Sequence, residues 1–344
     1  MPSSEQALTP PCCPGAASSD RNGRRQLRRT SNGLGFFLFC CVMTHLTVTQ
    51  LLYQFLNSIG YEKSFLYAGY SYLHPTLYFL LAGATMTVSF LVPGLLYLLV
   101  TRMPLGRVLP SDKVAPTLWI ALFATGLCLA MLSNLPANWV SGWVQSLLPQ
   151  MQSFSLLAMD GYGISPPLTA ILLYLIHSTI LPAFFEEFIF RGILLGQLRR
   201  WGDGLAIFIS AFLFGLFHSN LQQIPFAFLV GLVLGFLVVR TNNLWLSIAI
   251  HFANNTIASF PDAAKFFLSD ELALLIYNLL FYGVIVLGAV AALYLVWRHR
   301  SFFLPRPLPC QPLSLPSRIL AWTTAPGMWL IVIYRVLAIL FPWV

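Results

Sequence analysis

Two carboxylates and a guanidinium interrupt an otherwise apolar stretch of this sequence. Glu186, Glu187 and Arg191 lie within residues 168–198, a run long enough to cross a bilayer as one helix. Charged side chains at membrane depth are costly and face a bundle interior or a wet cavity, so these three mark a candidate functional site. Glu187 and Arg191 lie four residues apart on one helix face and can neutralise each other. Glu186 is rotated by about 100° from Glu187 and has no cation at helical spacing.

Two more polar clusters interrupt apolar runs further along the chain. His218 lies in one of them, and His251 and Asn255 stand four residues apart on one helix face in the other, with Asn254 on a different face. At about 1.5 Å per residue, Glu186 and these residues lie ~16–22 Å from the cytoplasmic ends of their helices. Polar residues at similar depth on three helices predict a single buried site.

The chemistry that this set allows is limited. A carboxylate in a partly desolvated site can act as a general base, and a histidine beside it can share the water that it deprotonates. A second histidine and an asparagine amide are donors that suit a developing oxyanion. The residues therefore predict a peptide hydrolase with water as nucleophile. One glutamate and two histidines (Glu186, His218 and His251) can also bind zinc, which is the alternative.

Taken in order, three motifs resemble those of the CPBP family, which comprises CAAX prenyl endopeptidases of the Ras-converting type and bacteriocin-processing proteins and is also called the Abi family. The motifs are Glu186-Glu187-x-x-x-Arg191, Phe214-x-x-x-His218 and His251-x-x-x-Asn255. The resemblance covers about 165–260. It implies an intramembrane endopeptidase built as an all-helical bundle.

The resemblance also implies a role for each matching residue. Glu186 is the base that activates water with help from His218, and His251 and Asn255 are assigned to the oxyanion. The remaining pair, Glu187 and Arg191, is implied to be structural or secondary to the site. We expect a mechanism without a metal or other cofactor, because an asparagine amide is a poor zinc ligand and a good oxyanion donor.

The composition places the chain in a membrane. Of its 344 residues, 58% are hydrophobic and 9% are charged, whereas a soluble domain carries about a quarter charged residues. The net charge of +8 does not indicate a nucleic-acid partner, because the arginines lie where a membrane protein needs them. The six cysteines show no metal or disulfide spacing. We expect the lipid bilayer and a membrane-embedded or lipidated peptide or protein as partners.

The apolar runs predict an all-α polytopic membrane bundle with about eight transmembrane helices. They lie at 34–56, 76–101, 115–135, 168–197, 204–220, 224–240, 243–260 and 272–297. Gly231 and Gly235 form a small-xxx-small pair, which predicts close packing of their helix against a neighbour.

Three segments are expected along the chain. Residues 1–32 are polar and arginine-rich and predict a disordered basic cytoplasmic arm. Residues 33–300 form the transmembrane bundle, with the protease core at about 165–260. Residues 301–344 are a proline-rich linker and an apolar C-terminal segment broken by Arg335.

Lysine and arginine positions predict that both termini are cytoplasmic, because one set of connections holds nearly all of them. We expect a bacterial plasma membrane, since no transit peptide is evident. Two other functions share the same residues. One is a non-catalytic relative that acts as a bacteriocin-immunity factor or membrane scaffold. The other, less favoured, is an ion-coupled transporter in which the buried glutamate and histidines relay protons.

Overall fold

The computed structural model describes residues 16–60, 74–147, 166–218, 221, 223–304 and 313–340. Within these ranges the chain is almost entirely helical. The nearest approach to a sheet there is one isolated bridge between Ser111 and Asn243. The predicted all-α fold is confirmed.

The helices are α1 (Ala16–Ser58), α3 (Pro75–Thr101), α4 (Leu105–Val108), α5 (Pro116–Leu132), α6 (Asn134–Leu147), α7 (Leu168–Leu175), η2 (Ile176–Ile180), α8 (Leu181–Glu187), η3 (Phe188–Leu195), α9 (Gly196–Leu198), η4 (Arg199–Trp201), α10 (Asp203–Phe217), α11 (Gln223–Thr241), α12 (Leu244–Ala264), α13 (Asp270–Arg298), η5 (Arg300–Phe302), α14 (Leu315–Thr323) and α15 (Pro326–Leu340). The segments from α7 to η4 follow one another without a break.

Within the described residues, each of the eight apolar runs expected from the sequence is mostly helical. Among the described residues, six helices are long and apolar enough to cross a membrane, and a seventh counts if α14 and α15, bent by 64°, form one span. Two of the eight predicted runs are not among these six helices. They correspond to α10, which has only 15 residues, and to α12, which carries His251 and Asn255. The chain is therefore an integral, multi-pass membrane protein.

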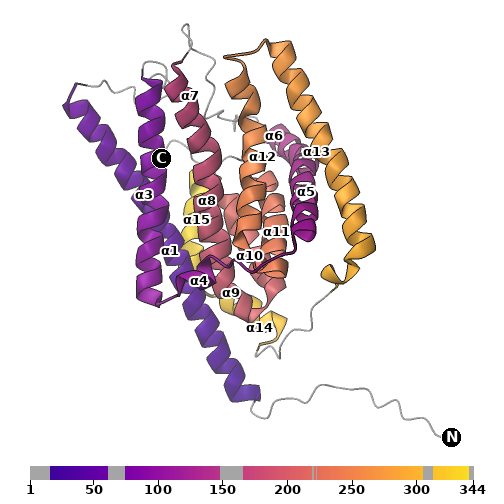
Figure 1. The fold of residues 1–344 in the computed structure, drawn as a ribbon. Coiled ribbons are helices and arrows are strands. Elements are labelled where there is room, and N and C mark those ends of the chain that lie inside the picture. The colour runs from indigo at the N-terminus through magenta and orange to yellow at the C-terminus, as the bar shows by residue number, and fades with distance from the viewer. Residues whose placement is uncertain are drawn as a thin grey trace, which may run out of the picture.

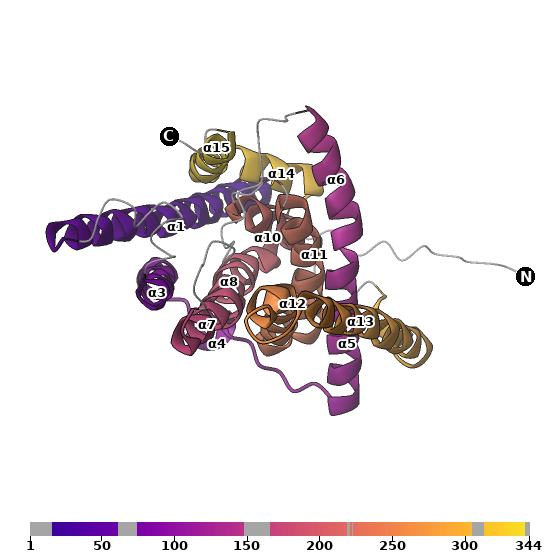
Figure 2. The ribbon, with the colours of Figure 1, turned by 90° about the horizontal axis from the view of Figure 1, so that it is seen from above.

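The helices α3, α7, α8 and α12 run in a similar direction, and α1 extends beyond the bundle at its N-terminal end (Figure 1). The view from above shows α5 and α6 lengthwise, across that direction (Figure 2). Seen from above, α12 lies between α8 on one side and α5 and α13 on the other (Figure 2). The helix α10 packs against α11, η3 and α15. This arrangement brings the three helices with the polar motifs into the middle of the bundle.

A short turn between α11 and α12 fixes where α12 begins. Asn242 has a positive φ of 49°, which asparagine tolerates better than most residues. The Asn243 side chain then accepts a hydrogen bond from the Leu246 backbone N–H at 3.0 Å and caps the helix. Its amide nitrogen donates to the Asp112 carbonyl at 2.9 Å, which ties the start of α12 to the segment before α5.

Close packing of α10 on α11 depends on small residues. A Cβ added at Gly231 would lie 2.9 Å from Cα of Ala211, and one added at Gly235 would lie 3.2 Å from the Ile207 side chain. The predicted role of this glycine pair in helix packing is confirmed.

The prediction of a disordered arm over 1–32 is wrong for residues 16–32, which are the first part of α1. Leu27 and Ser31 are buried there, and α1 packs against α14 and α15. The partner that buries this face lies nearly 300 residues further along the chain, so local composition could not indicate it. Residues 1–15 lie outside the described residues.

The C-terminal segment likewise joins the bundle. The part of the linker at 305–312 lies outside the described residues, and α14 and α15 follow it. Arg335, which interrupts the apolar pattern of α15, is buried against α10.

Candidate active site

Glu186 and Glu187 end α8, a short α-helical segment between the two π-helical segments η2 and η3. Pro182 near the start of α8 has no N–H to donate, so the regular hydrogen-bond ladder is interrupted there. π-Helical turns within α-helices are frequent at functional sites. They also change the angular offset between residues on either side, so α-helical periodicity alone misplaces residues along this helix.

Glu187 is the centre of a buried ionic cluster. Its Oε1 lies 2.8 Å from Nη1 of Arg191, and both side chains are 0% exposed. The predicted i,i+4 pair is therefore present. The same Oε1 also lies 3.0 Å from Nδ1 of His251 on α12. Because a carboxylate oxygen accepts, Nδ1–H of His251 donates this bond. This contact between helices could not be predicted from the spacing of residues within one helix.

Glu186 makes no comparable pair. Its Oε2 lies 3.9 Å from Nε2 of His251, beyond hydrogen-bond distance. Within the described chain, this oxygen has no hydrogen-bond partner. The side chain is 17% exposed, whereas Glu187 is wholly enclosed. The expectation that Glu186 lacks a cation at helical spacing agrees with this geometry.

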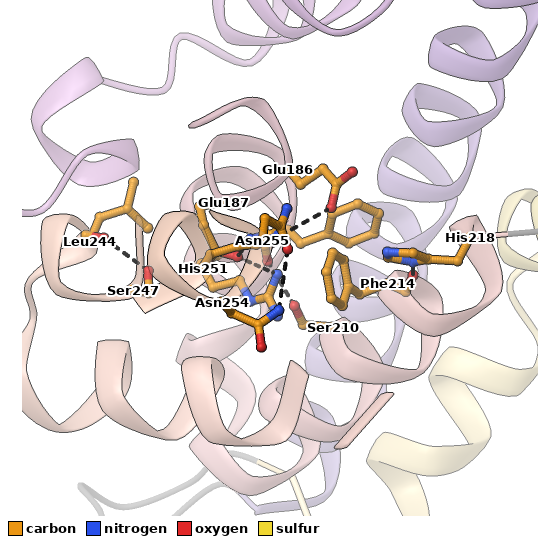
Figure 3. A network of polar contacts seen from close by, with 12 residues as sticks. Glu186, Glu187, Ser210, Phe214, His218, Leu244, Ser247, His251, Asn254 and Asn255 are labelled. Carbon is orange, nitrogen blue, oxygen red and sulfur yellow. Dashed lines mark hydrogen bonds and ion pairs between the residues drawn. The ribbon is translucent and has the colours of Figure 1, made fainter. Parts of the chain in front are cut away.

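The imidazole of His251 therefore lies between two carboxylates that play different parts. Glu187 holds one ring nitrogen, and the other nitrogen faces Glu186 (Figure 3). Holding one nitrogen of a histidine determines which way the other points and which protons the ring carries. Glu187 thus orients His251 toward Glu186.

His218 follows the last residue of α10 directly. Its Nδ1 lies 2.9 Å from the Phe214 carbonyl oxygen, so Nδ1–H donates and Nε2 is left without that proton in the neutral ring. Figure 3 shows His218 on the same side of the bundle interior as Glu186 and His251. Among the described residues, no direct hydrogen bond joins His218 to either of them.

The Phe214 ring fills the space between the two histidines (Figure 3). Its centroid lies 4.8 Å from that of His218 and 5.9 Å from that of His251, with both imidazoles nearly perpendicular to it. The Arg191 guanidinium lies 4.2 Å from the same centroid, within cation–π distance. One aromatic ring thus fixes the relative positions of residues from three helices.

Asn254 and Asn255 are adjacent on α12 and contact each other. Nδ2 of Asn254 donates to Oδ1 of Asn255 at 3.2 Å. Asn254 is buried, and Asn255 is partly exposed. With its oxygen engaged, Asn255 keeps its Nδ2 as a donor for another group. Sequence reasoning set Asn254 aside because neighbouring residues on a helix do not share a face.

The structure joins Glu186, Glu187, Arg191 and His251 in one set of charged contacts. His218 and Asn255 border that set through Phe214 and Asn254 respectively. Two contributions were missed in the sequence: Glu187 orients His251, and Phe214 separates the imidazoles. The only signal for the second was the spacing of one helical turn between Phe214 and His218.

The donors do not form a metal-binding group as they lie. In the part of the chain that the structure describes, no three His, Cys, Asp or Glu side chains are grouped so that they could hold a metal ion. The alternative zinc set was Glu186, His218 and His251. The Phe214 ring lies against both of its imidazoles, so these residues do not fit a zinc ion in this arrangement.

Comparison with known proteins places the site within a defined family segment. Residues 168–257 match the family described as type II CAAX prenyl endopeptidase Rce1-like. Over 88 residues the chain is 34% identical to a Bacillus subtilis (strain 168) protein named "Putative membrane peptidase YdiL". This alignment covers 25% of the present chain and 36% of that relative. No solved structure matches the chain.

These matches confirm the resemblance that the three motifs predict. Residues 168–257 are similar to the Rce1-like family, and every candidate residue from Glu186 to Asn255 lies within them. The helices α1 to α6 and α13 to α15 lie outside the matched segment.

Proposed function

We propose that this protein is an intramembrane endopeptidase that hydrolyses a peptide bond of a membrane-associated protein or peptide. The observation that carries the proposal is the position of Glu186, a carboxylate without a hydrogen-bond partner on Oε2, 3.9 Å from Nε2 of His251. A carboxylate held in this way inside an apolar bundle has the properties of a general base.

In the proposed reaction Glu186 accepts a proton from a water molecule while the water oxygen attacks the carbonyl carbon of the scissile bond. Nε2 of His218, left free because Nδ1 donates to Phe214, accepts a hydrogen bond from the same water. The tetrahedral intermediate then collapses, the C–N bond breaks, and the proton on Glu186 passes to the leaving amine. One water is consumed, and a carboxyl and an amine are formed.

The developing oxyanion takes hydrogen bonds from Asn255 and His251. Asn255 donates through Nδ2, because its oxygen accepts from Asn254. His251 donates through Nε2 when its ring carries both protons, and the carboxylates of Glu186 and Glu187 flank that ring. Removing one oxyanion donor from an enzyme costs about 10²–10³-fold in kcat.

The proposed mechanism routes no step through a metal and leaves Glu187 and Arg191 out of bond making. Glu187 acts through His251, and Arg191 compensates the charge of Glu187 at 2.8 Å. A buried carboxylate without such a partner would be strongly unfavourable.

For the substrate, the name of the matched family makes a prenylated CAAX-type tail the first candidate to test. We propose that the enzyme works in a bacterial plasma membrane with both termini in the cytoplasm. The distribution of lysine and arginine along the chain supports this orientation.

The test compares wild-type protein with Glu186→Gln in proteoliposomes. The probe is a fluorogenic CAAX peptide, offered with and without a farnesyl group. The matched control is Glu271→Gln, since Glu271 is an exposed carboxylate at the start of α13. We expect E186Q to lose cleavage by about 10²-fold or more while E271Q cleaves like the wild type. Full cleavage by E186Q would overturn the assignment.

Comparative peptidomics of membranes that hold wild-type or E186Q protein extends the search to substrates without a prenyl group. New termini that need Glu186 support the proposal. Protection against a secreted peptide that survives E186Q would instead support a binding or immunity function. Solute flux in the same vesicles would support a carrier.

A further inference from the structure

His218 directly follows the carboxyl end of α10, where side chains supply hydrogen-bond donors to the backbone carbonyl groups. An α-helix leaves its last four carbonyl groups without partners inside the helix. In α10 these belong to residues 214–217. His218 accounts for the first two, because Nδ1–H donates to the Phe214 oxygen at 2.9 Å and its backbone N–H donates to the Gly215 oxygen at 3.1 Å.

Arg335 on α15 accounts for the other two. Its Nε donates to the Leu216 oxygen at 3.0 Å, and its Nη2 donates to the Phe217 oxygen. The guanidinium carbon also lies 5.1 Å from the Phe217 ring centroid. The residue is only 9% exposed. A planar guanidinium can hold two neighbouring acceptors at once, which a lysine ammonium does less well.

The charge of Arg335 suits this place. The carboxyl end of a helix carries partial negative charge, and a cation there is favourable. A buried arginine in a membrane bundle pairs with acidic side chains or with backbone carbonyls, and it is a candidate functional residue. Here those carbonyls belong to the two residues directly before His218.

The same region links Arg335 to the rest of the site through aromatic rings. The Phe217 ring packs on Phe190 with centroids 5.1 Å apart, and Phe190 packs on Phe214 at 5.2 Å. Phe214 is the ring between the two histidines. Movement of the end of α10 would therefore change both the backbone and the packing that hold His218.

We propose that Arg335 is a positioning residue for His218, and that α15 is a working part of the site although it lies outside the matched segment 168–257. This inference rests on the proposed function, in which His218 orients the attacking water. Without Arg335, the Leu216 and Phe217 oxygens lose their donors in a low-dielectric interior. The end of α10 then rearranges to recover hydrogen bonds, and Nδ1–H of His218, which bonds to the Phe214 oxygen at the same helix end, is one donor that it can recruit.

A merely structural role of Arg335, in docking α15 onto the bundle, makes a different prediction. α15 is also held by the Gly327 N–H, which donates to Oδ1 of Asn32 on α1 at 2.9 Å, and by the buried Met328 and Ile331 side chains. Asn32→Ala weakens this docking and leaves in place the donors of Arg335 to the Leu216 and Phe217 oxygens, so it is the matched control.

The experiment measures kcat and KM of the farnesylated CAAX peptide for Arg335→Met, Arg335→Lys and Asn32→Ala in proteoliposomes. We expect R335M to lower kcat by about tenfold or more, with KM within about twofold, because water orientation and not substrate binding is affected. R335K recovers part of the loss, and N32A behaves like the wild type. Equal losses in N32A and R335M, or an unchanged kcat in R335M, would overturn the proposal.

A second readout does not depend on turnover. The rate at which diethylpyrocarbonate modifies His218, followed by mass spectrometry, reports the exposure and hydrogen bonding of its ring. We expect a change of several-fold in R335M and none in N32A. If R335M does not fold, R335K carries the same comparison. An unchanged His218 rate in the folded variants overturns the positioning role, whereas wild-type protein that cleaves nothing, with an altered His218 rate in R335M, counts against the proposed function alone.

Discussion

The side chain of Glu187 accepts a hydrogen bond from His251 across two helices, with 3.0 Å between Oε1 and Nδ1. The same oxygen lies 2.8 Å from the guanidinium of Arg191. The carboxylate of Glu187 therefore has two structural roles. It neutralises the buried cation of Arg191, and it fixes the orientation of the His251 imidazole, which faces Glu186 from α12.

The first prediction concerns this ionic cluster. Glu187→Gln leaves the Arg191 cation buried without a counter-ion, so we expect the free energy of unfolding to fall by about 3–5 kcal/mol. The double variant Glu187→Gln with Arg191→Met removes both charges and is expected to be more stable than E187Q alone. Thermal unfolding in detergent measures both. A double variant whose loss is the sum of the two single losses would show that the pair is not coupled.

The second prediction concerns the two asparagines of α12. Asn255→Ala removes a proposed oxyanion donor and is expected to lower kcat by about 10²–10³-fold with little change in KM. Asn254→Ala removes only the group that holds the Asn255 amide at 3.2 Å, so a smaller loss of kcat, about tenfold, is expected. Measuring kcat and KM of both variants with the CAAX probe shows which asparagine is the oxyanion donor. A larger loss in N254A would place the donor on Asn254.

The third prediction uses two glycines in apolar helices. Gly231→Ala places a Cβ 2.9 Å from Cα of Ala211, so α10 and α11 must separate, and we expect a loss of about 1–3 kcal/mol together with reduced activity. Gly283→Ala on α13 meets nothing within 4 Å and is expected to gain up to about 1 kcal/mol in helix propensity. Thermal unfolding should show shifts of opposite sign. Equal shifts would contradict the close approach of the two helices.

The fourth prediction concerns metals. Because the proposed mechanism uses Glu186 and His218 on a water molecule directly, we expect treatment with a strong chelator such as 1,10-phenanthroline to leave cleavage unchanged. Elemental analysis of the purified protein is the accompanying measurement. Loss of cleavage that returns on addition of zinc, with about one zinc per chain, would favour the alternative set of Glu186, His218 and His251.

Several features of the protein follow from the sequence alone, because they depend on periodicity within one helix. The apolar runs predicted about eight transmembrane helices, whereas six helices among the described residues, or seven if α14 and α15 form one span, are long and apolar enough to cross a membrane. The spacing of four residues predicted the ion pair between Glu187 and Arg191, and the three motifs predicted the family to which residues 168–257 are similar. Similar depths on three helices also predicted that the polar residues lie in one region. Each of these predictions uses only the residues of one helix at a time, or a comparison of positions counted along separate helices.

The tertiary structure decided which residue contacts which between helices. His251 bonds to Glu187 and faces Glu186. This arrangement depends on the rotation of α12 relative to α8 and on the π-helical segments η2 and η3 that flank α8. That residues 16–32 are helical, and that Arg335 completes the end of α10, depends on contacts between segments more than a hundred residues apart. Such contacts produce no periodic pattern in the sequence, because the two partners are brought together only when whole helices pack.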